Sequence, residues 1–160
     1  MKKLFALILT VALLATMSVT VSAEDSAPET GDKATTITYS VAPTYTVTIP
    51  TAITIDGAAD TISAENVVVE KGQYVSVALA ESNNFIVTTA EGATLTYTVL
   101  QGDEIVTAGG EILAVNPADG KTGSASIVFD INESAIKFAG VYTGTATFTI
   151  SVKNVPAVND

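Results

Sequence analysis

The chain has 160 residues, and 17 acidic residues against 7 basic ones give it a formal net charge of −10. A chain this acidic is repelled by phosphate backbones and anionic lipid surfaces, which argues against nucleic-acid binding. It contains no His and no Cys, so the usual general base, the thiolate nucleophile, the usual zinc ligands and disulfides are all absent. We therefore expect a protein that is not an enzyme. A hydrolase with two catalytic carboxylates is the remaining catalytic alternative.

The first 23 residues have the pattern of a secretory signal peptide. Lys2 and Lys3 precede an apolar run over residues 4–17, and Val21-Ser22-Ala23 is a small-residue cleavage site. A membrane anchor is the alternative, but the run is shorter than the ~20 residues that a spanning helix needs. Cleavage would leave 5 lysines and 17 acidic residues, a net charge of −12. The expected product is extracellular, secreted or associated with a cell surface, and the mature chain is not inserted in a membrane.

Residues 24–34 are rich in charged residues and show no periodic pattern of apolar side chains, so we expect a disordered leader there. From Ile37 to Ile49, apolar side chains alternate with Thr, Ser and Ala. This two-residue period predicts a strand with one apolar face directed to the core. The pattern passes through Pro43, which cannot donate to a central ladder, so this is an edge position or a break between two strands.

Short apolar stretches, separated by Gly, Asn, Asp and Pro, continue to the end of the chain. The further predicted strands are residues 67–70, 73–79, 85–89, 94–100, 104–106, 112–113, 125–131 and 141–152, and residues 52–55 are a candidate short strand. This spacing predicts an all-β fold, an antiparallel immunoglobulin-like β-sandwich over residues 35–153, followed by a polar tail over 154–160. The predicted inward side chains are Tyr45, Val47, Ile49, Val75, Val77, Leu95, Tyr97, Ile127, Phe129, Phe148 and Ile150.

The last predicted strand follows Ala139-Gly140 and alternates Thr with apolar residues from Tyr142 onward. Residues 139–150 resemble the terminal strand of secreted bacterial fimbrial and spore-coat-U-like domains. Residues 136–142 are similar to the approach to a tyrosine corner in immunoglobulin-like sandwiches, which implies that the Tyr142 hydroxyl bonds to upstream backbone and that Gly140 serves the turn.

Residues 45–50 likewise resemble first strands of Gram-positive surface domains. The chain departs from these relatives in having no Cys and no Leu-Pro-x-Thr-Gly sorting signal. The resemblance implies a structural or adhesive role outside the cell and no catalytic residue.

Candidate binding residues are few. Calcium takes oxygen ligands, and Asp56 with Asp60, or Asn116 with Asp119, are the best local groups. Asx residues in turns more often bond their own backbone, and no other cofactor is expected. Tyr74 falls out of phase with its strand, so it is a candidate ligand contact, for example with a sugar.

Two features remain as candidate interaction surfaces. The Thr-rich faces either stabilise exposed sheet through cross-strand pairs, or form an adhesive or glycosylated surface. The segment with Ile37, Tyr39 and Val41 either pairs within its own sheet or adds to the sheet of a neighbouring copy, which predicts self-association or another protein partner.

Overall fold

The computed structural model describes Val11–Ala12, for the backbone alone, and residues 36–156. The predicted leader over residues 24–34 lies outside these ranges, as do the predicted signal peptide apart from Val11–Ala12 and the last four residues of the predicted tail. The described part is all-β with antiparallel pairing, and its only helical element is the short 3-10 turn η1 (Glu133–Ala135). None of its helical segments has the length and apolar character needed to cross a membrane.

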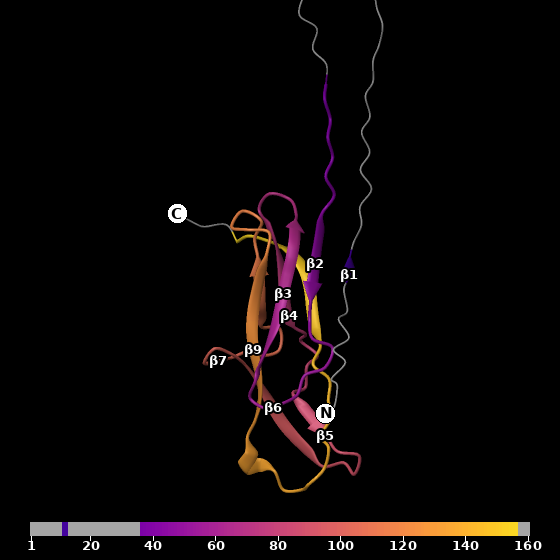
Figure 1. The fold of residues 1–160 in the computed structure, drawn as a ribbon, viewed down its shortest axis with the longest axis vertical. Coiled ribbons are helices and arrows are strands. Elements are labelled where there is room, and N and C mark those ends of the chain that lie inside the picture. The colour runs from indigo at the N-terminus through magenta and orange to yellow at the C-terminus, as the bar shows by residue number, and fades with distance from the viewer. Residues whose placement is uncertain (1–10, 13–35, 157–160) are drawn as a thin grey trace, which may run out of the picture.

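The strands form two sheets (Figure 1). The larger sheet has the order β1-β2-β3-β9-β6-β5, with β7 paired to β6, and the smaller has the order β10-β4-β8. The strands of the larger sheet are β1 (Val11–Ala12), β2 (Thr44–Thr48), β3 (Ala59–Val68), β5 (Ile86–Thr88), β6 (Thr94–Gln101), β7 (Glu104–Ile105) and β9 (Gly123–Ile131). The strands of the smaller sheet are β4 (Gln73–Leu79), β8 (Glu111–Val115) and β10 (Phe148–Asn154).

Both sheets contribute to a single hydrophobic core. Ile62 and Ile127 enter it from the larger sheet, and Val77 and Leu79 enter it from β4. All four side chains are at most 1% exposed. The period-two pattern explains this arrangement, because alternate side chains of each strand point to the same face.

Most of the predicted inward side chains are buried as expected. The buried ones are Val47, Val75, Val77, Leu95, Tyr97, Ile127 and Phe129. Four others are only half-buried and pack against the core, namely Tyr45, Ile49, Phe148 and Ile150. These four lie in β2, in β10 or just after β2, which are strands toward the edges of the sheets.

The prediction of one continuous final strand over residues 141–152 is wrong. Thr143 makes an isolated bridge with Thr88 of β5 in the larger sheet, whereas Phe148 pairs with Leu79 of β4 in the smaller one. Residues 144–147 therefore cross from one sheet to the other, and a crossing segment cannot keep a regular ladder with either. The alternation of Thr with apolar residues persists through the crossing, which is why the pattern suggested a single strand.

The first predicted strand is also shorter than expected. β2 begins at Thr44, directly after Pro43, and no described strand includes residues 36–43. Pro43 is thus neither an edge position within a strand nor a break between two strands, because it lacks an N–H, lies directly before β2 and follows no described strand.

Of the predicted strand over residues 67–70, only residues 67–68 are in a strand, and they form the end of the ten-residue β3. Asn66 has a φ of 54° and forms a bulge opposite β2, between the pairs Thr46–Glu65 and Thr44–Val68. The bulge shifts the alternation by one residue. Ala64 and Val67 therefore both face the core although they are three residues apart.

Candidate functional site

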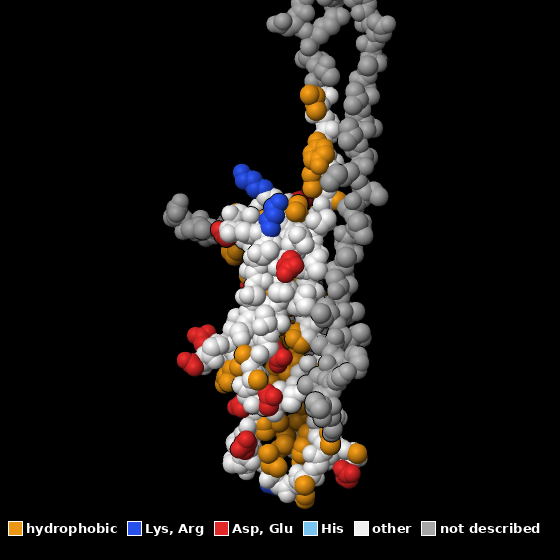
Figure 2. All heavy atoms as spheres, viewed as in Figure 1, with side chains coloured by type: hydrophobic (Ala, Val, Ile, Leu, Met, Phe, Trp, Pro, Cys, Tyr) orange, Lys and Arg blue, Asp and Glu red, His pale blue; other side chains and the backbone are white. Residues whose placement is uncertain are grey.

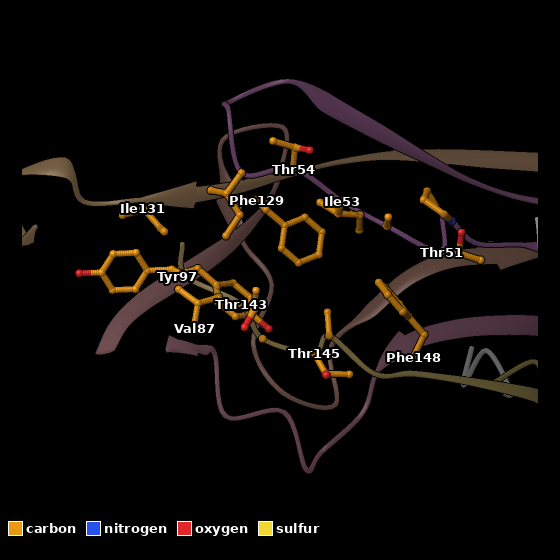
Figure 3. Close-up of a pocket in the computed structure, with 16 residues that line it drawn as sticks. Thr51, Ile53, Thr54, Val87, Tyr97, Phe129, Ile131, Thr143, Thr145 and Phe148 are labelled. Carbon is orange, nitrogen blue, oxygen red and sulfur yellow. The ribbon is translucent and has the colours of Figure 1, made fainter. Parts of the chain in front are cut away.

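A groove of about 670 Å³ opens at the point where the last segment crosses between the sheets (Figure 3). Its floor comes from β5, β6 and β9 of the larger sheet, with Val87, Tyr97 and Phe129 as its main side chains. Figure 3 shows Thr51 and Ile53 along one wall and Thr145 and Phe148 along the other. None of the lining residues is charged.

Apart from Phe148, the first residue of β10, the walls of the groove are not regular strands. Residues 50–55 follow the end of β2 and belong to no strand, so the candidate short strand over residues 52–55 is not formed. Residues 144–147 are the crossing segment. Thr143 exchanges backbone hydrogen bonds with Thr88 (2.8 and 3.0 Å), and the Thr147 carbonyl accepts from Ala80 N (2.9 Å). Thr147 N also donates to Asn83 Oδ1 over 3.1 Å, so the crossing segment is bonded to the larger sheet at its start and to the segment after β4 at its end.

Gly144 is required where the crossing segment passes β5. A Cβ at this position would lie 2.6 Å from the Ile86 carbonyl oxygen and 2.9 Å from Val87 Cγ1. The close approach of the two backbones, which only glycine permits, holds this wall of the groove against β5.

The floor of the groove contains an unsatisfied polar group. Tyr97 is 3% exposed and packs against Phe129, with ring centroids 5.6 Å apart and ring planes tilted by 39°. Its buried hydroxyl has no hydrogen-bond partner among the described residues. Burial raises the pKa of Tyr97 above its ordinary value of 10.0, so the hydroxyl is a neutral donor. A buried donor without an acceptor is costly, and native proteins rarely leave one.

A second, smaller pocket of about 300 Å³ lies on the outer side of the three-stranded sheet. It contains Tyr74 together with Glu111, Asn116, Asp119 and Thr122. Tyr74 is half-buried, and its hydroxyl donates to Glu111 Oε2 over 3.3 Å. Tyr74, the candidate ligand contact, therefore lies beside carboxylate and amide groups and is already hydrogen-bonded to the Glu111 carboxylate.

The Glu111 carboxylate connects the three strands of the smaller sheet. Its Oε2 atom accepts from the hydroxyls of Ser76 and Tyr74 on β4, and it forms an ion pair with Lys153 Nζ of β10 at 3.2 Å. Partial burial raises the pKa of Glu111, but the hydrogen bonds from Ser76, Lys153 and Tyr74 and the charge of Lys153 together bring it below its ordinary value. The carboxylate is thus held in its charged form.

The two residues of the predicted tyrosine corner lie just before the crossing segment. The Tyr142 hydroxyl donates to the Phe138 carbonyl over 2.9 Å, and its ring is half-buried against the core. Gly140 has a φ of 159°, and a Cβ there would come within 3.0 Å of Thr89 Cγ2. The absence of a side chain at Gly140 therefore lets the backbone pass close to Thr89, which directly follows β5.

The three residues of the predicted exchange segment are exposed. The exposed fractions are 91% for Ile37, 64% for Tyr39 and 52% for Val41. In Figure 1 this segment, at the indigo start of the described domain, projects away from the sheets. None of the three lines the pocket that contains Tyr74 or belongs to the hydrophobic cluster against which Tyr142 packs.

The candidate calcium ligands lie in two separate places, with Asp56 in a turn and Asp60 at the start of β3, and with Asn116 and Asp119 in the turn after β8. Asp56 Oδ1 accepts from Ala58 N (2.9 Å), and Asn116 Oδ1 accepts from Ala118 N (3.0 Å), as Asx residues in turns commonly do. Burial, and then the neighbouring charge of Asp56, raises the pKa of Asp60. Within residues 36–156, no three His, Cys, Asp or Glu side chains are grouped so that they could hold a metal ion.

Sequence reasoning did not find the groove. Its walls come from two loops far apart in the chain, and Ile53 and Ile131 have no motif to mark them. The apolar residues of 52–55 and the alternation through residues 144–147 both predict strands, not the walls of a groove. Comparisons with protein-family models, with curated proteins and with solved structures find no match to this chain.

Proposed function

We propose that the protein is a secreted, non-enzymatic structural or adhesive protein of a bacterial cell surface or extracellular matrix, which self-assembles by strand addition. The signal-peptide pattern over residues 1–23 supports export. Two antiparallel sheets around one core, with a Tyr142 hydroxyl bonded four residues upstream, support the immunoglobulin-like β-sandwich type. The resemblance of residues 139–150 to fimbrial and spore-coat-U-like domains supports the structural role.

The observation that carries self-assembly is the exposure of Ile37, Tyr39 and Val41. Single exposed apolar residues are ordinary, but here three lie at alternate positions, on one face of an extended segment. An extended segment of this kind can add to another sheet, where backbone bonds supply affinity and alternate side chains fill pockets.

Cleavage after Ala23 would also change the edge of the larger sheet. β1 pairs with β2 at Val47 and Thr46, and β1 lies within the predicted signal peptide. Its removal would leave the outer edge of β2 without this partner, and an uncovered edge is a template for pairing with another chain.

The test is to secrete the protein from the full-length chain and to follow its assembly by sedimentation and electron microscopy. The mass of the product should correspond to cleavage after Ala23. We expect ordered oligomers from the wild type and none from the triple variant Ile37→Ser, Tyr39→Ser, Val41→Ser. A matched control exchanges hydroxyls on the opposite face, with Thr36→Ser, Thr38→Ser and Ser40→Thr, and should assemble. A wild type that stays monomeric at high concentration and at every salt concentration would contradict self-assembly.

The second candidate function is a carbohydrate- or ligand-binding module, and the observation that favours it is the position of Tyr74 in a pocket with Glu111, Asn116 and Asp119. Aromatic rings next to carboxylates and amides can hold a polar ligand. Binding to a defined sugar on a glycan array, lost in Tyr74→Ala and kept in Tyr45→Ala, would favour this function over the structural one.

A further inference from the structure

We propose that Asn132 is an acceptor for N-linked glycosylation, in which a sugar is transferred to its side-chain amide from a lipid-linked sugar diphosphate. The inference depends on the export proposed above but not on self-assembly. Of all the asparagines in the sequence, only Asn132 is followed two positions later by Ser or Thr. The run Asn132-Glu133-Ser134 is therefore the single match to the acceptor pattern Asn-x-Ser/Thr.

The acceptor run lies where a transferase can reach it. Asn132, Glu133 and Ser134 are all exposed, and they follow the end of β9 in a segment that belongs to no strand. The bulky sugar cannot be accommodated in a packed interior, so an acceptor must lie on the surface of an exported chain. Figure 1 places this turn at the end of the molecule opposite to residues 36–41, so a sugar here would leave that segment free.

The turn holds the Asn132 amide in a conformation that favours transfer. Its Oδ1 atom accepts from the backbone N–H of Ser134 over 3.1 Å and from the Ser134 hydroxyl over 2.7 Å. Among the described residues, Nδ2 has no hydrogen-bond partner. A neutral amide nitrogen is a poor nucleophile, because its electron pair is delocalised onto the carbonyl oxygen. Loss of a proton from Nδ2 moves negative charge onto Oδ1, and two hydrogen bonds already directed at Oδ1 stabilise that charge.

The transfer balances with a glycosyl diphosphate as the sugar donor. Nδ2 loses one proton to a basic group of the transferase, and its electron pair forms the bond to C1 of the sugar. The bond between C1 and the diphosphate oxygen breaks, and the diphosphate leaves with that electron pair. Nucleotide diphosphate sugars are charged and do not cross a bilayer. An exported chain would therefore meet a sugar donor that a lipid anchors in the membrane.

A carboxylate two residues before Asn132 gives the acceptor a second recognition element. Asp130 is exposed near the end of β9, and the backbone is still extended at Asn132, with φ −70° and ψ 98°. The side chains of Asp130 and Asn132 therefore leave the chain on the same side. A cationic side chain of the transferase can pair with Asp130 while the reacting amide occupies the active site.

The loop that follows Asn132 exposes apolar side chains that a sugar would cover. The exposed fractions are 48% for Ile136, 64% for Phe138 and 80% for Val141. Figure 2 shows hydrophobic side chains gathered toward this end of the molecule. Exposed apolar patches promote association, and a bulky, hydrated sugar makes the neighbouring surface more soluble. We therefore expect the glycan to reduce the apolar surface at this end.

The test is the mass of the Asn132 peptide from the chain secreted by the cells that produce it. We expect this peptide to carry a sugar, whose release by a glycoamidase leaves aspartate in place of Asn132. Ser134→Ala and Asn132→Gln should lose the sugar, whereas Ser134→Thr, which keeps the hydroxyl, should retain it. The matched control Asn154→Gln changes another exposed asparagine, which has no Ser or Thr two positions later, and should also retain it. All of these side chains are exposed, so the urea midpoints should be unchanged.

Two further measurements test the carboxylate and the apolar loop. In vitro, the purified chain is mixed with a membrane oligosaccharyltransferase and a polyprenyl-diphosphate oligosaccharide. Asp130→Asn should slow transfer about tenfold, the effect of one charge-assisted hydrogen bond. An unchanged rate would contradict the role of Asp130. Removal of the glycan from the wild type should raise the fluorescence of bound anilinonaphthalenesulfonate, and unchanged fluorescence would contradict the covering of the apolar loop.

The outcomes separate this inference from the proposed function. A secreted product that is cleaved after Ala23 and carries no sugar on Asn132 overturns the inference and leaves export intact. If the chain is not exported, the reaction in vitro still decides, because transfer to Asn132 supports the acceptor and no transfer overturns it. A glycosylated chain that stays monomeric supports the inference and contradicts self-assembly.

Discussion

At the scale of single residues, the Glu111 carboxylate makes a testable contribution to stability. It accepts from Ser76, which is fully buried, and pairs with Lys153, so three strands meet at one side chain. The pKa of Glu111 is lowered in the folded protein, so its stabilising effect is present above the unfolded pKa, near 4.5, and is lost as the pH falls through the folded value. Glu111→Gln should therefore lower the free energy of unfolding at pH 7 by about 1 kcal/mol.

Urea unfolding of wild type and variant between pH 7 and pH 3 measures this effect. The difference between the two proteins should shrink as the pH falls below 4.5. Glu104→Gln, in the exposed β7, is the matched control and should show little difference at any pH. A Glu111→Gln difference that is constant over this range would mean that the side chain acts through packing and not through its charge.

At the scale of the elements, the bulges explain where sequence reasoning failed. Strands with unbroken alternation, such as β6 with Leu95, Tyr97 and Val99 buried, were found with nearly correct bounds. The bounds of β3 were not predicted correctly. The bulge at Asn66 shifts its alternation by one residue, and small residues such as Ala64 occupy its inward positions. β8 has a similar irregularity opposite β4, and Ile112 and Leu113 are both buried in consequence.

The bulge at Asn66 can be tested by substitution. Its φ of 54° lies in the left-handed region, which Asn and Gly tolerate and β-branched residues do not. Asn66→Val should lower the free energy of unfolding by about 1–3 kcal/mol, whereas Asn66→Gly should change it much less. The side chain is exposed, so loss of packing is not part of the expected effect. Equal losses in both variants, measured by urea unfolding, would mean that the Asn66 side chain and not its backbone matters.

At the scale of the whole molecule, sequence reasoning predicted the class of fold better than the candidate site. The all-β, antiparallel character follows from local alternation, which each strand displays alone. The groove depends instead on residues 50–55 and 144–147 meeting across the core, and on Gly144 approaching Ile86. Such convergence between distant segments leaves no local pattern, so the sequence indicated the exchange segment with Ile37, Tyr39 and Val41 but not the groove.

The shared core predicts that the two sheets unfold together. Ile62 of the larger sheet and Leu79 of the smaller one are both fully buried in the same cluster. Ile62→Ala and Leu79→Ala should each lower the free energy of unfolding by about 2–5 kcal/mol, through lost transfer energy and the cavity left behind. Because neither sheet can bury its apolar face alone, each variant should shift one cooperative transition for the whole domain. Amide hydrogen exchange, read separately in β9 and β4, should show the same loss of protection in both sheets. Loss of protection confined to the sheet that carries the substitution would show that the two sheets unfold independently.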